Sequence, residues 1–533
     1  MDTELIVISD LHLSDGYDER TKKYSRHEDF FFDHEFERFL RHLQYLNRHH
    51  KRYFNLVIAG DLFDFLQVDP DGRKLKEYLG KQSAQASLRS IVTKKEYEFG
   101  LGTEEVKTVW KLVEVIAKGH NVLFQTLANF LSKGNRLSII TGNHDIELYW
   151  PGVQHALIEC IFNSNRDATT KEEIEQSIEF YPWFYYDEDH KVYIEHGNQY
   201  DSLNSFQYFL YPVLQPESTE TALWLPFGSF FVRYFFNKLE LINPFADNIK
   251  PPTRYMRWAL KEDWLQFAKN IFRYGMTLIG QFIKGGKLSG DKKKLLEREN
   301  RKKHDDLADK CSLPRVAVEE IYSFKAPPYT RRRFFNIFTY SACSFAVVAT
   351  IMFLAIYMLY WKYSTKLLPD RLYKSLYSFF VMVFPVIGWV GKRLQRDPIR
   401  KNLMNILKRI QEGSSGLIAH IAKWISKFFQ ARYVEKACQI KTCLKKHDKG
   451  VHSIIFGHTH DPDIRFIGKA EKGEECWYFN TGTWTTVFSE EERIIREEKQ
   501  FTFVWITKDK AELWRWNDCL KQPVNMILFE SER

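Results

Sequence analysis

The stretch Glu4-Leu5-Ile6-Val7-Ile8-Ser9-Asp10-Leu11-His12 places four apolar residues directly before a serine, a carboxylate and an imidazole. A short apolar run that ends in a turn predicts a buried β-strand. Further runs of this kind lie at 55–59 and 137–140, and apolar residues at helical spacing separate them, at 36–46 and from 104 to about 131. Strands that alternate with helices predict an α/β fold with a mostly parallel sheet covered on both faces.

The same pattern returns near the other end of the sequence, where three more strands are predicted, at 451–456, 476–480 and 501–506. The chain has 533 residues, which is more than one compact core usually holds. We therefore expect a core formed by residues 1–205 and 450–533, interrupted by a large, mainly helical insertion at 206–449.

Metal-binding residue types follow five of the predicted strands. The five segments are Ser9-Asp10-Leu11-His12, Gly60-Asp61-Leu62-Phe63-Asp64, Gly142-Asn143-His144-Asp145, Glu195-His196-Gly197-Asn198 and Gly457-His458-Thr459-His460. Ligands bind an open α/β sheet in the crevice outside the carboxyl ends of its strands, and glycines let the backbone turn sharply there. The sequence therefore predicts one site built from carboxylate, amide and imidazole ligands.

These five segments, in this order, resemble the calcineurin-like metallophosphoesterases, as does Asn480-Thr481-Gly482-Thr483. The resemblance covers residues 5–201 and 451–484 and leaves out the insertion. It implies a sandwich of β-sheets flanked by helices, and a hydrolase with a binuclear metal centre. The implied ligands are Asp10, His12 and His460 for one metal ion and Asn143, His196 and His458 for the other, with Asp61 bridging both.

Oxygen and nitrogen ligands without a thiolate suit Mn, Fe or Zn, and we expect two divalent ions, Mn²⁺ first. Two such ions neutralise phosphate oxygens and make hydroxide from a bound water. His144 follows the ligand Asn143 directly, so we expect it to act as the acid at the rim of the site. Asp145 is expected to orient His144, and Asp64 to support a metal ligand by hydrogen bonding.

The insertion lies between His196 and His458, where the UDP-2,3-diacylglucosamine pyrophosphatases place their substrate cap, and the chain is similar to them in that respect. That family typically has Arg at the position of His144. The substrate, and the choice between a phosphomonoester and a phosphodiester, therefore stay open.

The net charge of +9 is the sum of two parts of opposite sign. Residues 206–449 hold 42 Lys and Arg against 19 Asp and Glu, whereas the remainder holds 35 against 49. A basic segment of this size predicts an anionic partner, either a membrane surface or nucleic acid. The run 284–303, with nine basic and three acidic residues, is one candidate contact and is equally typical of a solvated helix face.

Two uncharged runs predict a membrane hairpin. Residues 334–361 contain no Asp, Glu, Lys or Arg, and 28 helical residues suffice to span a bilayer. Residues 375–391 form a shorter run with Pro385 and Gly388, which spans the bilayer or lies at its interface. The alternative for both is a buried hairpin in a soluble cap. Basic flanks at both ends predict an inner or plasma membrane location with the catalytic domain facing the cytoplasm.

The aromatic stretch 206–245 suits an interfacial anchor, an acyl-chain groove or the core of the cap. Seven scattered cysteines without a C-x-x-C pair exclude a disulfide scaffold and favour a reducing compartment.

Taken together, the site residues, the uncharged runs and the basic insertion favour a membrane-anchored phosphoesterase acting on a lipid-linked or membrane-proximal phosphoester. A nuclease-type phosphodiesterase that binds nucleic acid through the insertion is the alternative. A regulatory membrane protein with a degenerate catalytic domain is disfavoured by the complete set of ligands, and the oligomeric state stays open.

Overall fold

The computed structural model describes residues 3–81, 84–167, 169–214, 221–240, 274, 277, 280, 290–329, 417–469, 473–491 and 494–526. The chain divides into two compact units, one formed by residues 1–328 and 430–533 and the other by 329–429. The predicted membrane segments 334–361 and 375–391 lie outside the described residues. Among the helices that are described, none is long and apolar enough to cross a bilayer.

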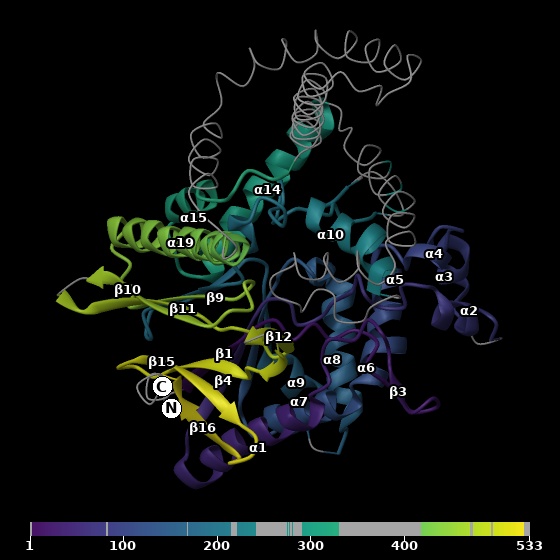
Figure 1. Ribbon diagram of the computed structural model, residues 1–533, viewed down its shortest axis with the longest axis horizontal. Coiled ribbons are helices and arrows are strands. Elements are labelled where there is room, and N and C mark those ends of the chain that lie inside the picture. The colour runs from purple at the N-terminus through teal and green to yellow at the C-terminus, as the bar shows by residue number, and fades with distance from the viewer. Residues whose placement is uncertain are drawn as a thin grey trace, which may run out of the picture. The chain divides into compact units, whose positions relative to one another are not determined.

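The first unit contains a seven-stranded sheet in the order β16-β15-β14-β1-β4-β5-β6 (Figure 1). Four neighbouring strands are parallel, namely β1 (Thr3–Ile8), β4 (Tyr53–Ala59), β5 (Arg136–Ile140) and β6 (Ile178–Tyr181). The other three complete the sheet in antiparallel pairs, namely β14 (Thr502–Ile506), β15 (Ala511–Asn517) and β16 (Gln522–Asn525). The predicted α/β fold with a parallel sheet is therefore confirmed for the strands that precede the insertion.

A second sheet of five strands has the order β10-β11-β9-β8-β7. Its three central strands are parallel, namely β8 (Val192–Glu195), β9 (Ser453–Phe456) and β11 (Glu475–Asn480). The edge strands β7 (Phe184–Asp187) and β10 (Asp463–Lys469) are antiparallel to their neighbours. Residues from before and after the insertion therefore pair directly, since β8 lies beside β9.

Successive residues of β1 contribute to different cores, because side chains alternate between the two faces of a sheet. Ile6 and Ile8 belong to a buried cluster with residues of the helices α1 (Asp33–His50), α7 (Asn121–Leu131) and α8 (Pro151–Ser164). Leu5 and Val7 belong to a cluster that includes residues of the five-stranded sheet. A second sheet covers the inner face and helices flank the outer side (Figure 1), which agrees with the sandwich of β-sheets that the family resemblance implied.

Parts of the predicted insertion pack against the five-stranded sheet, on its side away from β1 and β4 (Figure 1). Phe206, Phe209, Ile321 and Ile440 are buried in the same cluster as the sheet residues. For the start of the aromatic stretch the structure thus supports a core role, while Phe231 is 36% exposed. The described helices of this region are α10 (Phe227–Phe231), the π-helix η4 (Val232–Phe236), α11 (Asn237–Glu240), α14 (Gly290–Lys310), α15 (Arg315–Ser323) and α19 (Leu417–Lys446).

Shorter elements connect these layers. They are β2 (Tyr17–Asp18), β3 (Lys23–Tyr24), α2 (Arg73–Leu79), α3 (Ala86–Ile91), α4 (Glu96–Phe99), η2 (Ile146–Tyr149), α9 (Lys171–Ser177), η3 (Asn198–Tyr200), β12 (Thr486–Glu491) and β13 (Ile494–Lys499). The helix predicted from 104 to 131 is divided into α5 (Glu105–Trp110), the π-helix η1 (Lys111–Ile116), α6 (Ala117–Gly119) and α7.

The division before α7 has a tertiary cause at Gly119 and His120. A Cβ atom at Gly119 would collide with the backbone of Asp15, so only glycine allows this approach. The next residue, His120, is fully buried, with Nδ1 3.1 Å from Asp33 Oδ2 and Nε2 3.3 Å from Glu28 Oε2. The chain therefore leaves the helical path where it can pair an imidazole with two buried acids.

The His120→Gln variant is expected to lose about 3 kcal/mol or more of unfolding free energy, because two buried carboxylates lose their cationic partner. Burial lowers the pKa of His120, but Asp33 and Glu28 outweigh it and raise this pKa to about 10, from an ordinary value of 6.5. Because the pKa is higher in the folded state, protonated His120 stabilises the folded protein fully below pH 6.5. This contribution to the unfolding free energy is lost as the pH rises through about 10. Urea unfolding at about pH 6 and about pH 10.5 measures the difference.

The matched control is His50→Gln, since His50 is exposed at the end of α1 and should leave the unfolding free energy unchanged. A His120→Gln loss of the same size at both pH values would contradict the ionic interpretation.

Candidate metal centre

The predicted ligand residues lie at the carboxyl ends of parallel strands from both sheets. In the seven-stranded sheet, Asp10 follows β1, Asp61 follows β4 and Asn143 follows β5. In the five-stranded sheet, His196 follows β8 and His458 follows β9. Because the two sheets pack face to face, the five strand ends meet at one edge of the sandwich.

Five of the seven predicted ligands have a left-handed backbone, a conformation that non-glycine residues rarely adopt and that marks functional sites. They are Asp10, His12, Asp61, His458 and His460, with φ between 53° and 68°. Hydrogen bonds between the first two motifs hold this geometry. The Asp10 N–H donates to Gly60 O at 3.2 Å, and the His12 N–H donates to Asp61 O at 3.0 Å.

One group of potential ligands consists of Asp10, His12 and His460, whose ligand atoms all lie within 4.8 Å of one another. His460 Nε2 lies 3.2 Å from Asp10 Oδ1 and 3.1 Å from His12 Nε2. Asp10 is fully buried, yet its Oδ1 has no hydrogen-bond partner among the described residues. A buried carboxylate oxygen needs a partner, and two imidazole nitrogens beside it complete a donor set that suits a divalent cation.

The second group consists of Asp61, His196 and His458. His196 Nε2 lies 3.0 Å from Asp61 Oδ2 and 3.2 Å from Asn143 Oδ1. The Nδ1–H of His196 donates to Ala59 O at 2.9 Å, so Nε2 is the ring nitrogen that would bind a metal ion, with loss of its proton. Burial lowers the pKa of His196, but Asp61 outweighs it and raises this pKa to about 9 in the absence of a cation.

Asp61 lies between the two groups. Its Oδ2 is 3.0 Å from His196 Nε2 in one group and 3.9 Å from His12 Nε2 in the other. Its Oδ1 accepts a hydrogen bond of 2.8 Å from the backbone N–H of His144, which fixes the carboxylate. This position is the one that a bridging ligand would need.

A glycine lets the second and fourth motifs approach each other. Gly60 has a φ of +86°, and a Cβ atom placed on it would lie 2.5 Å from His196 Cγ. Any larger residue at this position would displace the His196 ring, so the glycine before Asp61 is required by the packing of the site.

Asp64, rather than Asp145, orients His144. His144 Nδ1 lies 2.6 Å from Asp64 Oδ2, and the same oxygen lies 3.8 Å from His12 Nδ1. Burial alone would raise the pKa of Asp64, but His144 and His12 hold it below its usual range. The predicted orienting role of Asp145 is therefore wrong in this geometry.

Asp145 instead joins the second and third motifs through the backbone. Its two carboxylate oxygens accept hydrogen bonds from Leu62 N at 2.8 Å and from Gly142 N at 2.7 Å. Burial and the nearby Asp61 raise the pKa of Asp145 to about 7. Both of its carboxylate oxygens are thus engaged by backbone N–H groups and not by the neighbouring His144.

The sequence analysis missed Asp201, whose Oδ2 lies 3.6 Å from His458 Nε2. In the sequence, the position of Asp201 five residues after the proposed ligand His196 could have indicated that it lies near the site. A further group of potential ligands, Glu320, Cys443 and His447, was also not predicted; Cys443 lies in the last turn of α19, and His447 directly follows that helix. Lys446 Nζ already donates to Glu320 Oε2 at 2.9 Å there, so this carboxylate has a cationic partner.

Comparisons of the chain with protein-family models, with curated proteins and with solved structures found no match. The fold and the site by themselves define an α/β protein of two packed sheets with clustered potential metal ligands at the strand ends.

Proposed function

We propose that the protein is a metal-dependent phosphoesterase, a hydrolase that uses two divalent ions to cleave a phosphate ester. The observation that carries the proposal is the position of Asp61, which lies within 4 Å of imidazole nitrogens in both ligand groups. Two cations that share a carboxylate would neutralise the phosphate oxygens and supply hydroxide as the nucleophile. Mn²⁺ is the first candidate for both positions, with Fe or Zn as alternatives.

Asp10, His12 and His460 would hold one ion, and Asn143, His196 and His458 the other. Five of the seven proposed ligands have a left-handed backbone, and hydrogen bonds to the second motif hold Asp10 and His12 in it, so this part of the site is ordered before any ion binds. Such preorganisation lowers the cost of assembling the site.

His144 is proposed to act on the substrate directly. Asp64 holds its Nδ1, and its side chain is 20% exposed, whereas that of His12 is 6% exposed. The ring is therefore more exposed than that of His12, and Nε2 is the nitrogen that would face the substrate. From there it would donate a hydrogen bond to a phosphoryl oxygen and a proton to the departing alkoxide.

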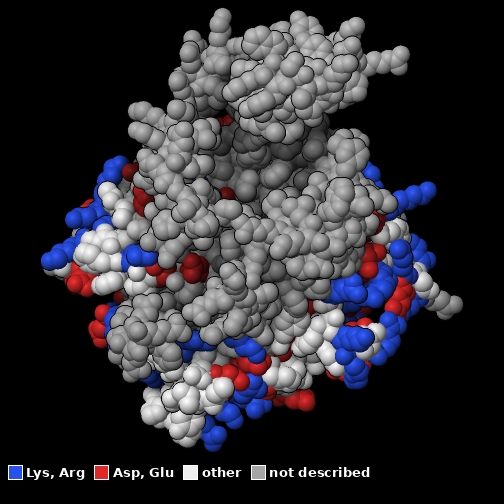
Figure 2. Space-filling view, viewed as in Figure 1, with Lys and Arg blue, Asp and Glu red and all other residues white. Residues whose placement is uncertain are grey.

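The substrate is proposed to be a lipid-linked or membrane-proximal phosphoester at the cytoplasmic side of an inner or plasma membrane. This proposal rests on the uncharged runs 334–361 and 375–391 and on the basic insertion around them. A nuclease-type phosphodiesterase is the second candidate, favoured by the same basic insertion. On the face drawn in Figure 2, Lys and Arg alternate with Asp and Glu over the described residues, so that part of the surface offers no continuous basic groove.

The test is hydrolysis by the full-length protein of a panel of phospholipids, nucleotide-linked lipids and oligonucleotides, with and without Mn²⁺. We expect metal-dependent cleavage of a lipid substrate and sedimentation of the protein with membranes from a detergent-free lysate. Cleavage of oligonucleotides alone, with steep salt dependence and a protein left in the supernatant, would favour the nuclease. The phosphoesterase proposal fails if no member of the panel is cleaved with Mn²⁺, Fe²⁺ or Zn²⁺.

A further inference from the structure

A cavity of about 380 Å³ lies between α14, α15 and residues 207–208, and none of its lining residues belongs to the candidate metal centre. This volume is in the range of small-molecule sites in proteins. The lining residues are Gln207, Tyr208, Lys293, Glu297, Asn300, Arg301, His304, Glu319, Tyr322 and Lys325.

The wall around Lys325 is a hydrogen-bonded network. Lys325 Nζ donates to Gln207 O at 2.7 Å and to Tyr322 Oη at 2.6 Å. Tyr322 Oη also accepts from Asn300 Nδ2 at 3.2 Å and donates to Gln207 O at 3.1 Å. The hydroxyl of Tyr322 therefore already makes one hydrogen bond as donor and two as acceptor. An ammonium group has three N–H donors, and the third N–H of Lys325 remains for a ligand in the cavity.

His304 adds a buried polar atom that needs a partner. It is 5% exposed, and its Nδ1 has no hydrogen-bond partner among the described residues. Burial, together with nearby cations that include Lys325 and Arg301, lowers the pKa of His304 to about 4. The ring is therefore neutral at physiological pH and can pair with a hydroxyl group. Because His304 lines the cavity, a ligand or water there is its nearest source of a partner.

Two further cations stand at the mouth of the cavity. Lys293 and Arg301 are exposed and lie on the same face of α14 as His304, at helical spacing. Neither forms an ion pair within the part of the chain that the structure describes. Glu297 and Glu319 also line the mouth, but Glu319 Oε1 already accepts from Arg315 Nε at 3.2 Å. The cavity therefore presents more positive than negative charge.

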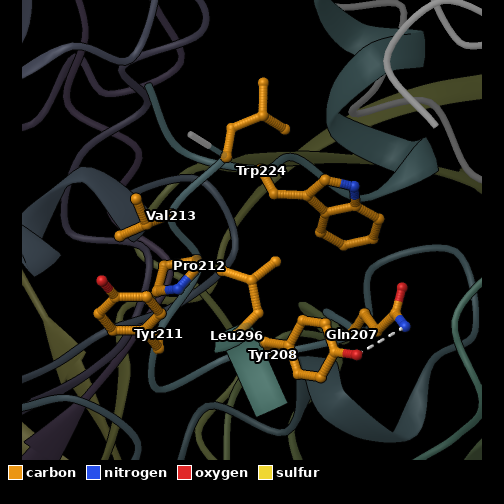
Figure 3. Close-up of a pocket in the computed structure, with 8 residues that line it drawn as sticks. Gln207, Tyr208, Tyr211, Pro212, Val213, Trp224 and Leu296 are labelled. Carbon is orange, nitrogen blue, oxygen red and sulfur yellow. Dashed lines mark hydrogen bonds between the residues drawn. The ribbon is translucent and has the colours of Figure 1, made fainter. Parts of the chain in front are cut away.

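Packed apolar side chains support one wall of the cavity from behind. Gln207 and Tyr208 line both this cavity and a narrow crevice of about 10 Å³, which is shown in Figure 3. Gln207 Nε2 donates to Tyr208 Oη at 3.2 Å across the crevice (Figure 3). The other residues of the crevice are Tyr211, Pro212, Val213, Leu214, Trp224 and Leu296. Gln207 and Tyr208 therefore lie between the cavity and this apolar crevice.

We propose that this cavity binds a small phosphorylated molecule, with its phosphate among Lys293, Arg301 and Lys325. Hydroxyl groups of the ligand would reach His304 Nδ1 and the carboxylate of Glu297. The cations supply charge-assisted hydrogen bonds, the strongest type available to a phosphate oxygen. This binding site is separate from the metal centre and does not depend on the function proposed for it.

The test is a calorimetric titration of the full-length protein with inorganic phosphate in the Asp61→Asn background, which removes the charge of the proposed bridging ligand. Arg301→Gln and Lys293→Gln are each expected to weaken phosphate binding by about tenfold, since each removes a charge-assisted hydrogen bond. Arg298→Gln is the matched control, because Arg298 lies on the same helix outside the cavity and pairs with Glu299. It should bind phosphate as the parent protein does.

Two results would overturn the proposal. One is phosphate binding by Arg301→Gln and Lys293→Gln with the parent affinity. The other is an Asp61→Asn protein that binds no phosphate at all, which would assign any binding by the unmutated protein to the metal centre. Circular dichroism of each variant confirms its fold, and substitutions of exposed residues such as Arg301 and Lys293 are expected to leave it intact.

Discussion

Replacing Asp61 by Asn is expected to lower the rate of phosphoester hydrolysis by more than about 10³-fold, because Asp61 is the proposed ligand common to both ions. The amide oxygen of Asn can still accept the hydrogen bond from the His144 N–H, so the variant removes charge and leaves the loop in place. The measurement is turnover of an aryl phosphodiester with Mn²⁺, accompanied by the metal content per chain. We expect the metal content to fall together with the rate.

Asp71→Asn is the matched control for this experiment, since Asp71 is exposed in the turn before α2 and belongs to neither group of proposed ligands. It should retain both the rate and the metal content of the unmutated protein. If Asp61→Asn hydrolyses the diester at an undiminished rate with two ions bound, the bridging assignment is wrong.

The His144→Gln variant is expected to lower turnover by about 10²-fold to 10⁴-fold while leaving the metal content unchanged, as for the loss of a general acid. The effect should depend on the leaving group. The acidic phenol of an aryl phosphodiester can leave as the phenolate without receiving a proton. The alkoxide of an alkyl phosphodiester is far more basic and needs a proton as it leaves. We therefore expect a larger loss for the alkyl substrate, and the ratio of the two rates measures proton donation specifically.

Asp64→Asn tests the orientation of His144, because its carboxylate lies 2.6 Å from His144 Nδ1. It should lower turnover less than His144→Gln and show the same dependence on the leaving group. His155→Gln is the surface control, since the side chain of His155 is 58% exposed. An equal loss for aryl and alkyl substrates in His144→Gln would show that the residue positions the substrate and transfers no proton.

The sequence predicted the strands and the clustered site residues well, because both are local features. Apolar runs such as Leu5 to Ile8 and Asn55 to Ala59 are strands in the structure, and the ligand residues follow them at once. Parallel strands bring their carboxyl ends to one edge, so residues distant in sequence were expected to meet there. His12 and His460, 448 positions apart, lie 3.1 Å from each other through their Nε2 atoms.

Side-chain direction within a motif was not predictable in the same way. Asp145 adjoins His144 in sequence, yet its carboxylate accepts from Leu62 N and Gly142 N. Asp64 is 80 positions away and holds His144 instead. The neighbouring second motif supplies the partners of both side chains, Leu62 N for Asp145 and Asp64 for His144, and the sequence of the third motif does not contain them.

The sequence by itself determined the parallel strands, the identity of the candidate ligand residues and the excess of basic charge in residues 206–449, since these depend on residue order and type alone. Only the tertiary structure decided how the faces of the two sheets pack together, that Asp64 orients His144, and that α14 and α15 enclose a basic cavity. The physical reason is that these features arise from contacts between segments that are not adjacent in the sequence, such as those of Asp64 and His144, which are 80 positions apart. Such contacts depend on how buried surfaces fit together, and a linear pattern of residues does not contain that information.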